Sequence, residues 1–323
     1  MSEFDLIKQY FTKTTQHTNL GIGDDAALIS ISAGCELAIS TDMLVAGTHF
    51  FSDAAPYQLG WKSLAVNLSD MAAMGANPKW ATLSIALPES NADWLAEFSK
   101  GFFACANAFN VDLIGGDTTR GPLTISVQIM GEVPNSLAIK RCGAQIDDDI
   151  WVSNQLGSAA FALAHLLGTQ SIPNDSQTEY MLALHTPQPR VALGIALRNI
   201  ATSAIDISDG LLSEVGHIVK ASKTQRNITE MGAVINLDHI PTTPYIQKNL
   251  NQPAFQKFVL AGGDDYELCF TAPCKQISAL EALSNKLDLK LTKIGKITAK
   301  NGINVLNQQQ RIHLEASGYN HFN

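Results

Sequence analysis

The hydrophobic pattern of residues 61–76, WKSLAVNLSDMAAMGA, predicts a helix that is buried on almost every side. On a helical wheel the apolar residues cover most of the circumference, and Ser63, Asn67 and Asp70 form one narrow polar stripe. An ionised carboxylate in a buried helix is costly unless it is paired, hydrogen-bonded or bound to a metal. No Lys or Arg lies one turn away on this stripe, so we expect the partner of Asp70 to be a distant part of the chain or a cation.

The first half of the chain mixes strand and helix patterns without strict alternation, which predicts an α+β domain. We expect a strand at 37–41 that ends at Asp42 and a continuation at 49–51 after a turn. A glycine turn, 115–122, is expected to follow a short buried strand. The remaining expected elements are helices at 4–12 and 91–107 and strands at 80–87, 111–114 and 124–133.

A polar segment at 134–149 indicates the join between two domains, 1–138 and 139–323. The second half predicts a C-terminal α/β domain, which opens with a strand at 150–153. Its further strands are expected near 204–206, 234–237, 266–271, 289–297 and 303–306, and its helices near 158–167, 189–201, 211–219, 255–260 and 276–286.

Length and composition narrow the class of protein. A chain of 323 residues is long for one hydrophobic core, which favours two domains. The net charge of −8 disfavours nonspecific binding of nucleic acid. No apolar run reaches membrane-spanning length and the N-terminus has no signal-peptide pattern, so we expect a cytoplasmic protein without membrane contact. Five cysteines without a Cys-x-x-Cys pair favour reduced thiols.

Seven aspartates lie at the edges of apolar elements or in glycine turns, where a solvated acid is not expected. They are Asp24, Asp25, Asp42, Asp70, Asp117, Asp206 and Asp209. Each one alone is explained as a helix cap or turn residue. Converging carboxylates would repel one another without a cation, and oxygen ligands select hard cations such as Mg²⁺. Together the seven favour a magnesium site that phosphates complete.

The chain has many acids but no recognisable nucleophile and base, which favours phosphoryl transfer. It contains no G-x-S-x-G, H-E-x-x-H or G-x-x-x-x-G-K-[ST] motif. Residues 21–26, GIGDDA, match a dinucleotide fingerprint only superficially, because no convincing strand precedes them. Phosphoryl transfer depends on positioning and charge neutralisation, and a phosphate acceptor needs no general base. A metal-dependent phosphohydrolase and a non-enzymatic, cation-stabilised binding protein stay open as alternatives.

Six segments resemble the thiamine-monophosphate kinases of the PurM-like (AIR synthetase-type) superfamily. They are GIGDDAA (21–27), STDMLVAGTHF (40–50), KSLAVNLSDMAAMGA (62–76), LIGGDTTRGPL (113–123), AIDISDGLLSEVGHIVKAS (204–222) and GGDDYELCF (262–270). The resemblance implies a homodimer whose N-terminal sheets form a β-barrel, with a C-terminal α/β domain closing over a cleft. It also implies magnesium-assisted transfer of the ATP γ-phosphate directly to thiamine monophosphate, without a phospho-enzyme, as the last step of thiamine diphosphate biosynthesis.

The resemblance also carries roles to individual residues. Asp25, Ser40, Thr41, Asp42, Asp70, Asp117, Asp206 and Asp209 match magnesium ligands, among which Asp70, Asp117 and Asp209 are the expected catalytic acids. Gly116, Asp117, Arg141 and Ser208 match ATP contacts, and His49, Asp264 and Tyr319 match contacts to the thiamine substrate. The family commonly has Glu at position 264, so this substrate contact is one methylene shorter here.

Other PurM-like ATP-dependent enzymes are a further alternative. Selenophosphate synthetases have a reactive Cys or selenocysteine near the N-terminus, whereas the first cysteine here is Cys35, in a different sequence context. The hydrogenase-maturation relatives end in Cys, whereas this chain ends His-Phe-Asn. Both comparisons favour the kinase.

Overall fold

The computed structural model describes residues 3–312 and divides the chain into two compact units. The first unit comprises Met1–Met71 and Ala76–Ser136, and the second comprises Ala72–Gly75 and Leu137–Asn323. The domain boundary that the sequence indicates, between 138 and 139, stays a prediction.

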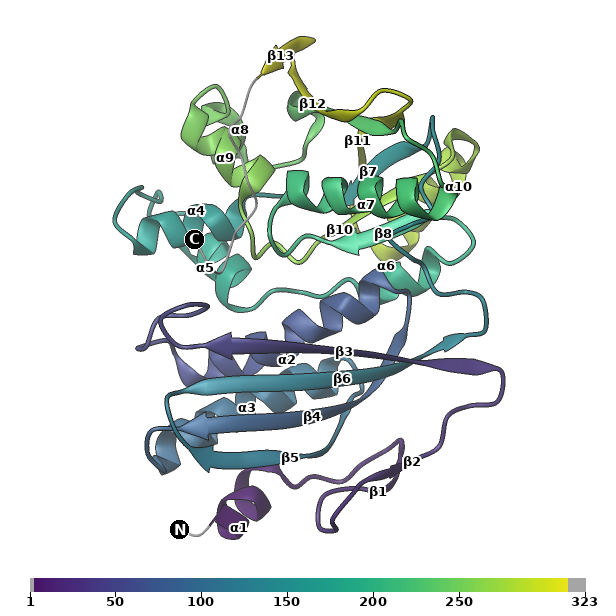
Figure 1. Ribbon diagram of the computed structural model, residues 1–323. Helices are drawn as coiled ribbons and strands as arrows, with labels where there is room; N and C mark the ends of the chain where they lie inside the picture. The colour runs from purple at the N-terminus through teal and green to yellow at the C-terminus, as the bar shows by residue number, and fades with distance from the viewer. Residues whose placement is uncertain (1–2, 313–323) are drawn as a thin grey trace. The chain divides into compact units, whose positions relative to one another are not determined.

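The first unit contains a four-stranded sheet in the order β3-β6-β4-β5 (Figure 1). The strands are β3 (Cys35–Val45), β4 (Asn77–Leu87), β5 (Asp112–Arg120) and β6 (Thr124–Pro134). β6 pairs antiparallel with both β3 and β4, whereas β4 pairs parallel with β5. Two helices, α2 (Pro56–Ala73) and α3 (Ala92–Ala108), lie behind one face of this sheet in Figure 1. The predicted α+β architecture is confirmed.

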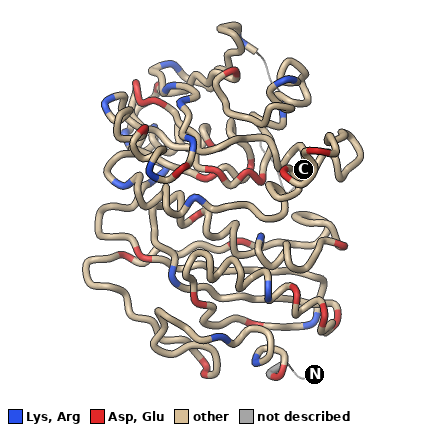
Figure 2. Tube along the Cα trace, turned by 180° about the vertical axis from the view of Figure 1, so that it is seen from behind, with Lys and Arg blue, Asp and Glu red and all other residues tan. Residues whose placement is uncertain are grey.

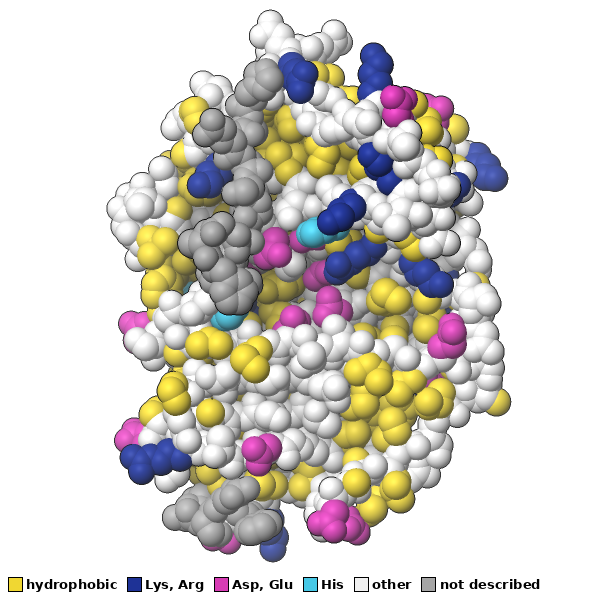
Figure 3. Space-filling view, viewed as in Figure 1, with side chains coloured by type: hydrophobic (Ala, Val, Ile, Leu, Met, Phe, Trp, Pro, Cys, Tyr) yellow, Lys and Arg dark blue, Asp and Glu magenta, His cyan; other side chains and the backbone are white. Residues whose placement is uncertain are grey.

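The two faces of this sheet differ in exposure. On the helix-covered face, Ile125, Val127 and Ile129 of β6 are at most 1% exposed. On the opposite face, Ile39 and Met43 of β3 are each 56% exposed. Figure 3 shows hydrophobic side chains gathered over this part of the first unit. The period-2 alternation of a strand therefore places apolar side chains on an open face as well as in the core.

Helix α2 is buried all round, as its pattern predicts: Leu64, Ala65 and Leu68 are completely buried. It begins five residues before the predicted start. Close packing against α3 depends on two glycines, because a Cβ at Gly60 would lie 2.1 Å from Phe98 O and one at Gly101 would lie 1.9 Å from Tyr57 O. Backbone approach at this distance leaves no room for a side chain.

The N-terminal segment is tied to the sheet by one buried carboxylate. It contains α1 (Glu3–Leu6), a π-helical turn (Ile7–Phe11), β1 (Thr18–Leu20) and β2 (Leu28–Ile29). Asp112 of β5 accepts hydrogen bonds from Gln16 N (2.9 Å), His17 N (2.6 Å) and Thr18 Oγ1 (2.7 Å). Asp112 is 7% exposed, and these three donors offset the cost of burying its charge.

The second unit contains a seven-stranded sheet in the order β13-β12-β9-β11-β7-β10-β8. Its pairs are antiparallel except for the parallel pair of β9 and β12. The strands are β7 (Asp149–Ser153), β8 (Ser203–Asp206), β9 (Gly232–Asn236), β10 (Leu268–Ala272), β11 (Leu291–Thr298), β12 (Gly302–Asn307) and β13 (Gln310–Ile312). The α-helices are α4 (Ser158–Leu166), α5 (Gln177–His185), α6 (Val191–Ala196), α7 (Leu211–Arg226), α8 (Pro244–Asn249), α9 (Pro253–Ala261) and α10 (Ile277–Leu287), with 3-10 turns at Leu237–His239 and Cys274–Gln276.

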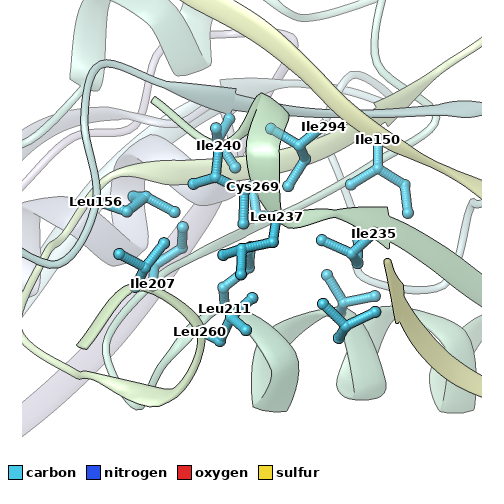
Figure 4. Close-up of a cluster of buried hydrophobic side chains, with 14 of the residues drawn as sticks. Ile150, Leu156, Ile207, Leu211, Ile235, Leu237, Ile240, Leu260, Cys269 and Ile294 are labelled. Atoms are coloured by element: carbon cyan, nitrogen blue, oxygen red, sulfur yellow. The ribbon is translucent and has the colours of Figure 1, made fainter. Parts of the chain in front are cut away.

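The core of the second unit joins this sheet to helix α7. In Figure 4 the side chains of Ile150, Ile235, Ile294 and Leu211 belong to one cluster, and all four are completely buried. Each such side chain contributes about 1.5–3 kcal/mol relative to exposure. Cys269 lies in the same cluster, where burial raises the pKa of its thiol and makes it a poor nucleophile.

Several predicted boundaries were wrong. Strand β3 continues through Asp42 to Val45, and residues 49–51 form no strand but only a single bridge between Ala46 and Phe50. Strand β5 continues through the residues predicted as a glycine turn, so Asp117 lies in a strand. The predicted helix at 189–201 is reduced to α6, and the sequence pattern missed β1, β2, α5, α8 and β13.

The structure bears on membrane-spanning segments and on the state of the cysteines. Within the described residues, no helix combines the length and the apolar character needed to cross a membrane. All five cysteines lie among these residues and are free thiols.

Candidate functional site

Asp70, the carboxylate of the buried helix α2, has a partner on strand β3. Ser40 Oγ donates a hydrogen bond to Asp70 Oδ2 at 2.6 Å. The two residues are 30 positions apart in the chain, so the expectation of a distant partner is confirmed. A charge-assisted hydrogen bond of this length fixes the orientation of the carboxylate.

The polar stripe of α2 makes a second contact with β3. Asn67 Oδ1 accepts a hydrogen bond from Asp42 N at 3.0 Å, and Asn67 Nδ2 donates to Ser63 O at 3.0 Å. Asn67 is completely buried, so both polar ends of its amide are used. Because side chains alternate along a strand, Ser40 and Asp42 share one face of β3 and Thr41 faces the other. Thr41 Oγ1 donates to Val127 O at 3.0 Å.

His49 lies beyond the end of β3, and its ring is fixed by the backbone. Val45 N donates to His49 Nδ1 at 3.0 Å. An Nδ1 that accepts a hydrogen bond carries no proton, so the neutral ring has its proton on Nε2. The residue expected to contact substrate therefore presents a donor at Nε2.

Gly116 and Asp117 lie on β5, at the opposite edge of the sheet from β3. Two strands, β6 and β4, separate them from Asp42, a distance of three interstrand spacings of about 4.8 Å each. Gly116 has φ +150°, and a Cβ there would lie 1.8 Å from Leu83 O. Asp25 lies in the loop between β1 and β2 and is exposed. Within the first unit, the structure brings Ser40, Asp42 and Asp70 together but does not bring Asp117 to them.

In the second unit, the end of β8 and the loop between β8 and α7 hold three of the expected residues. Asp206, the last residue of β8, is 4% exposed, and Ser208 and Asp209 follow it. Gly210 ends the loop with φ +113°, and a Cβ at this position would lie 2.7 Å from the backbone of Ala261. Glycine is therefore required where the chain enters α7.

Glu214, on the first turn of α7, is a buried acid that the sequence reasoning missed. It is 3% exposed, and its Oε1 accepts a hydrogen bond from Asp209 N at 3.4 Å. Burial, with a smaller contribution from the charge of Asp209, raises the pKa of Glu214 to about 7. Hydrogen bonds from Asp209 N and the Ser208 hydroxyl and the charge of Arg141 act in the opposite direction. Asp209 and Ser208 therefore bind one carboxylate whose charge also interacts with that of Arg141.

The sequence did contain a signal for Glu214. Residues 211, 214 and 218 share one helical face, on which Leu211 and Ile218 are at most 1% exposed. An acid on an apolar helical face needs a partner for the same reason that Asp70 does.

The loop at 262–267 packs against the loop at 206–210 through backbone hydrogen bonds. Asp264 N donates to Ser208 O and Tyr266 N donates to Ile207 O, each at 2.9 Å. Next to Asp264, Asp265 accepts from Gly157 N, the N-cap residue of α4, at 2.9 and 3.1 Å. Burial raises the pKa of Asp265 well above its ordinary value, although the bond from Gly157 N lowers it. The expected substrate contact Asp264 is thus held beside the expected ATP contact Ser208.

A largely buried ion pair lies at the end of this loop, directly before β10. Arg190 binds both oxygens of Glu267, with Nε–Oε2 at 2.7 Å and NH2–Oε1 at 2.5 Å. Ser153 Oγ donates to Glu267 Oε2 at 2.5 Å and Asn154 Nδ2 donates to Oε1 at 3.0 Å. No sequence pattern joined Arg190 to Glu267, because 77 positions separate them.

Several acids of the second unit are gathered in one band of the chain trace (Figure 2). Among residues 3–312, no group of three or more His, Cys, Asp or Glu side chains is arranged closely enough to hold a metal ion. The expected substrate contact Tyr319 lies outside the described residues.

The mixed sheets and their acidic loops define a PurM-like protein of the AIR synthetase type. Residues 23–133 match the family described as AIR synthase related protein, N-terminal domain. A crystal structure of thiamine-monophosphate kinase from Stenotrophomonas maltophilia K279a is 44% identical, covers 90% of this chain and 91% of that chain, and has a TM-score of 0.82. The solved AaThiL complexed with AMPPCP and TMP is 26% identical, with coverage of 99% and 96% and a TM-score of 0.77.

Curated relatives narrow this class to one family. The thiamine-monophosphate kinase of Escherichia coli (strain K12) is 42% identical and aligns over 99% of this chain and 98% of its own. That of Bacillus subtilis (strain 168) is 34% identical over the full length of both chains. The chain belongs to the thiamine-monophosphate kinase family.

Proposed function

We propose that this protein transfers the γ-phosphate of ATP directly to thiamine monophosphate and releases thiamine diphosphate and ADP. This is the last step of thiamine diphosphate biosynthesis. The observation that carries the proposal is the contact between β3 and α2, where Ser40 fixes Asp70 and Asn67 fixes the backbone of Asp42. This contact brings two acids, Asp42 and Asp70, to the layer between one strand and one helix. The chain is also 42% identical to a thiamine-monophosphate kinase over nearly its whole length.

The chemistry of the acceptor supports direct, in-line transfer without a phospho-enzyme. The phosphate of thiamine monophosphate is already an anion near neutral pH, so no residue has to remove a proton from it. The buried cysteines, Cys105 in the first unit and Cys269 in the second, are not nucleophiles either, because burial raises the pKa of each thiol and leaves it protonated. The described acids would serve to position charge and would not attack phosphorus.

Magnesium is the cation that the donor set fits. The expected ligands are carboxylates and hydroxyls only: Asp25, Ser40, Thr41, Asp42, Asp70, Asp117, Asp206 and Asp209. Oxygen ligands of this kind, without His or Cys, suit Mg²⁺ where phosphates complete the coordination. When bound, the metal would neutralise the charge that builds up on the transferred phosphoryl group. Asp70, Asp117 and Asp209 are the acids assigned to the catalytic metals.

The remaining contacts are assigned by side-chain chemistry. Gly116, Asp117, Arg141 and Ser208 would contact ATP, and His49, Asp264 and Tyr319 would contact thiamine monophosphate. Arg141 is exposed, as a group that reaches a phosphate must be, and Ser208 lies just before the N-terminus of α7.

A homodimer is the proposed assembly, and the cytoplasm the proposed compartment. Ile39 and Met43, each 56% exposed on the open face of the β3-β6-β4-β5 sheet, offer an apolar surface for a second copy. Pairing of two such sheets would form the expected β-barrel. In sedimentation, we expect the wild-type protein at twice the monomer mass. We expect the Met43→Lys variant at the monomer mass.

The reaction is tested by phosphorus NMR of purified protein with ATP, Mg²⁺ and thiamine monophosphate. A parallel sample lacks the thiamine compound. Thiamine diphosphate and ADP in the complete mixture alone are the expected result. Equal release of inorganic phosphate in both samples would favour a metal-dependent phosphohydrolase, and no reaction in either would indicate a different PurM-like ATP-dependent enzyme.

A further inference from the structure

Tyr266 and Asp264 form a side-chain pair inside the loop at 262–267. Tyr266 Oη donates a hydrogen bond to Asp264 Oδ1 at 3.0 Å. The tyrosine is 9% exposed and the bond is partly buried, and a hydrogen bond to a carboxylate is stronger there than in open water.

Both residues have left-handed backbone conformations, with φ +67° at Asp264 and φ +49° at Tyr266. Aspartate tolerates this conformation, whereas for a bulky tyrosine it is uncommon and strained. Such strain persists only where the surrounding structure holds it, and it concentrates at functional sites.

Backbone contacts with the loop at 206–210 hold the strained segment in place. The bonds from Asp264 N to Ser208 O and from Tyr266 N to Ile207 O are both 2.9 Å long. A Cβ at Gly263 would lie 2.4 Å from Ser208 O, so the two backbones are in direct contact. The backbone of Asp264 is therefore fixed from one side, and the tyrosine hydroxyl fixes its side chain.

We propose that Tyr266 is a positioning residue whose hydroxyl orients the Asp264 carboxylate toward the cationic organic part of thiamine monophosphate. The inference rests on the proposed function and adds to it a residue that sets substrate affinity. Thiamine carries a permanent positive charge on its thiazolium ring, and a carboxylate attracts it most strongly when held in one orientation. Aspartate, one methylene shorter than glutamate, places this carboxylate close to a backbone that is already fixed.

The test compares steady-state kinetics of wild-type protein and Tyr266→Phe, which keeps the ring and removes only the hydroxyl. Loss of a hydrogen bond to a charged group predicts a rise of about tenfold in KM for thiamine monophosphate. KM for ATP and kcat are expected to stay within about twofold, because the change affects substrate binding and not transfer.

Two further variants separate positioning from a general structural effect. Tyr180→Phe is the matched control, because Tyr180 is a completely buried tyrosine of the same unit whose hydroxyl lies 2.5 Å from Thr243 Oγ1. It is expected to leave KM for thiamine monophosphate unchanged. In an Asp264→Asn background, Tyr266→Phe is expected to add less than a twofold change, since its effect passes through the carboxylate.

Calorimetric binding of thiamine monophosphate, measured without ATP on the same proteins, provides an independent readout. Weaker binding by Tyr266→Phe than by wild type and Tyr180→Phe supports the inference. An unchanged affinity, an equal rise in KM for ATP, or an undiminished effect in the Asp264→Asn background would overturn it. Wild-type protein that binds thiamine monophosphate but forms no thiamine diphosphate would refute the proposed function, and the binding comparison would still decide the role of Tyr266.

Discussion

Ser40 on strand β3 and Asp70 on helix α2 are joined by a hydrogen bond of 2.6 Å from Ser40 Oγ to Asp70 Oδ2. The bond explains how a helix that is buried all round accommodates a carboxylate at its polar stripe. It also holds that carboxylate over the face of β3 on which Asp42 lies, so both acids belong to the layer between β3 and α2.

Replacement of Asp70 by Asn should remove the charge without removing the partner of Ser40. Because the Asn side-chain oxygen still accepts a hydrogen bond, we expect the fold to be kept and the midpoint of thermal unfolding to change little. Loss of a metal-binding charge predicts a fall in kcat of about a hundredfold or more, measured by formation of thiamine diphosphate. Asp93→Asn, at an exposed position on the first turn of α3, is the control. Full activity of Asp70→Asn would refute the catalytic assignment.

Replacement of Gly116 by Ala should destabilise the first unit. The added Cβ would lie 1.8 Å from Leu83 O at a residue with φ +150°, so the pairing of β5 with β4 has to shift. We expect a loss of about 2–4 kcal/mol in the free energy of unfolding, measured in urea. Gly121→Ala is the matched control, since its nearest neighbour would be Ala86 Cβ at 3.4 Å. Equal stabilities of the two variants would contradict the tight contact.

Replacement of Arg190 by Leu should leave the Glu267 carboxylate buried without its cation. The side chain of Glu267 is 6% exposed, and breaking a buried ion pair typically costs about 3–5 kcal/mol. Urea unfolding should show this loss in Arg190→Leu. Lys100→Ala removes the exposed pair with Glu97, whose side chains are 66% and 51% exposed, and should change stability by less than about 0.5 kcal/mol. A small effect at both sites would show that the buried pair contributes no more than a surface pair.

The carboxylate of Glu132 on β6 should support the first unit at neutral pH and lose this role in acid. Burial by itself would raise its pKa, but hydrogen bonds from Lys79 Nζ (2.7 Å) and Ser32 N (2.7 Å), with the Lys79 charge, lower the pKa below its ordinary value. A carboxyl with a lowered folded-state pKa adds stability above its unfolded pKa of about 4.3, and this stability is lost as pH falls through the folded-state value.

Glu132→Gln should therefore reduce stability at pH 7 by about 1–3 kcal/mol and approach the wild type as the pH falls below about 4. Unfolding in urea across this pH range measures the difference. Glu89→Gln, in an exposed loop, provides the control and should show no such pH dependence. A difference between Glu132→Gln and wild type that stays constant in acid would contradict this assignment.

The sequence by itself determined the features that depend on local periodicity and on the cost of burying charge. The apolar pattern around Asp70 predicted both the buried helix and the need for a distant partner, and Ser40 is that partner. The acidic motifs and their order along the chain were sufficient to predict the PurM-like α+β class. These signals are local because helices and strands each impose their own repeat on the chain.

Only the tertiary structure decided which of these residues meet. Asp42 and Asp117 have similar sequence settings, yet strands β6 and β4 separate their strands, because the pairing order of a sheet is set by nonlocal packing. The burial of Glu214 beside Asp209 and the pairing of Arg190 with Glu267 likewise depend on how separate elements pack. Hydrophobic periodicity predicts which face of an element is buried, but it does not specify which residue of another element lies opposite. The chemistry of the loops depends on which residues lie opposite one another.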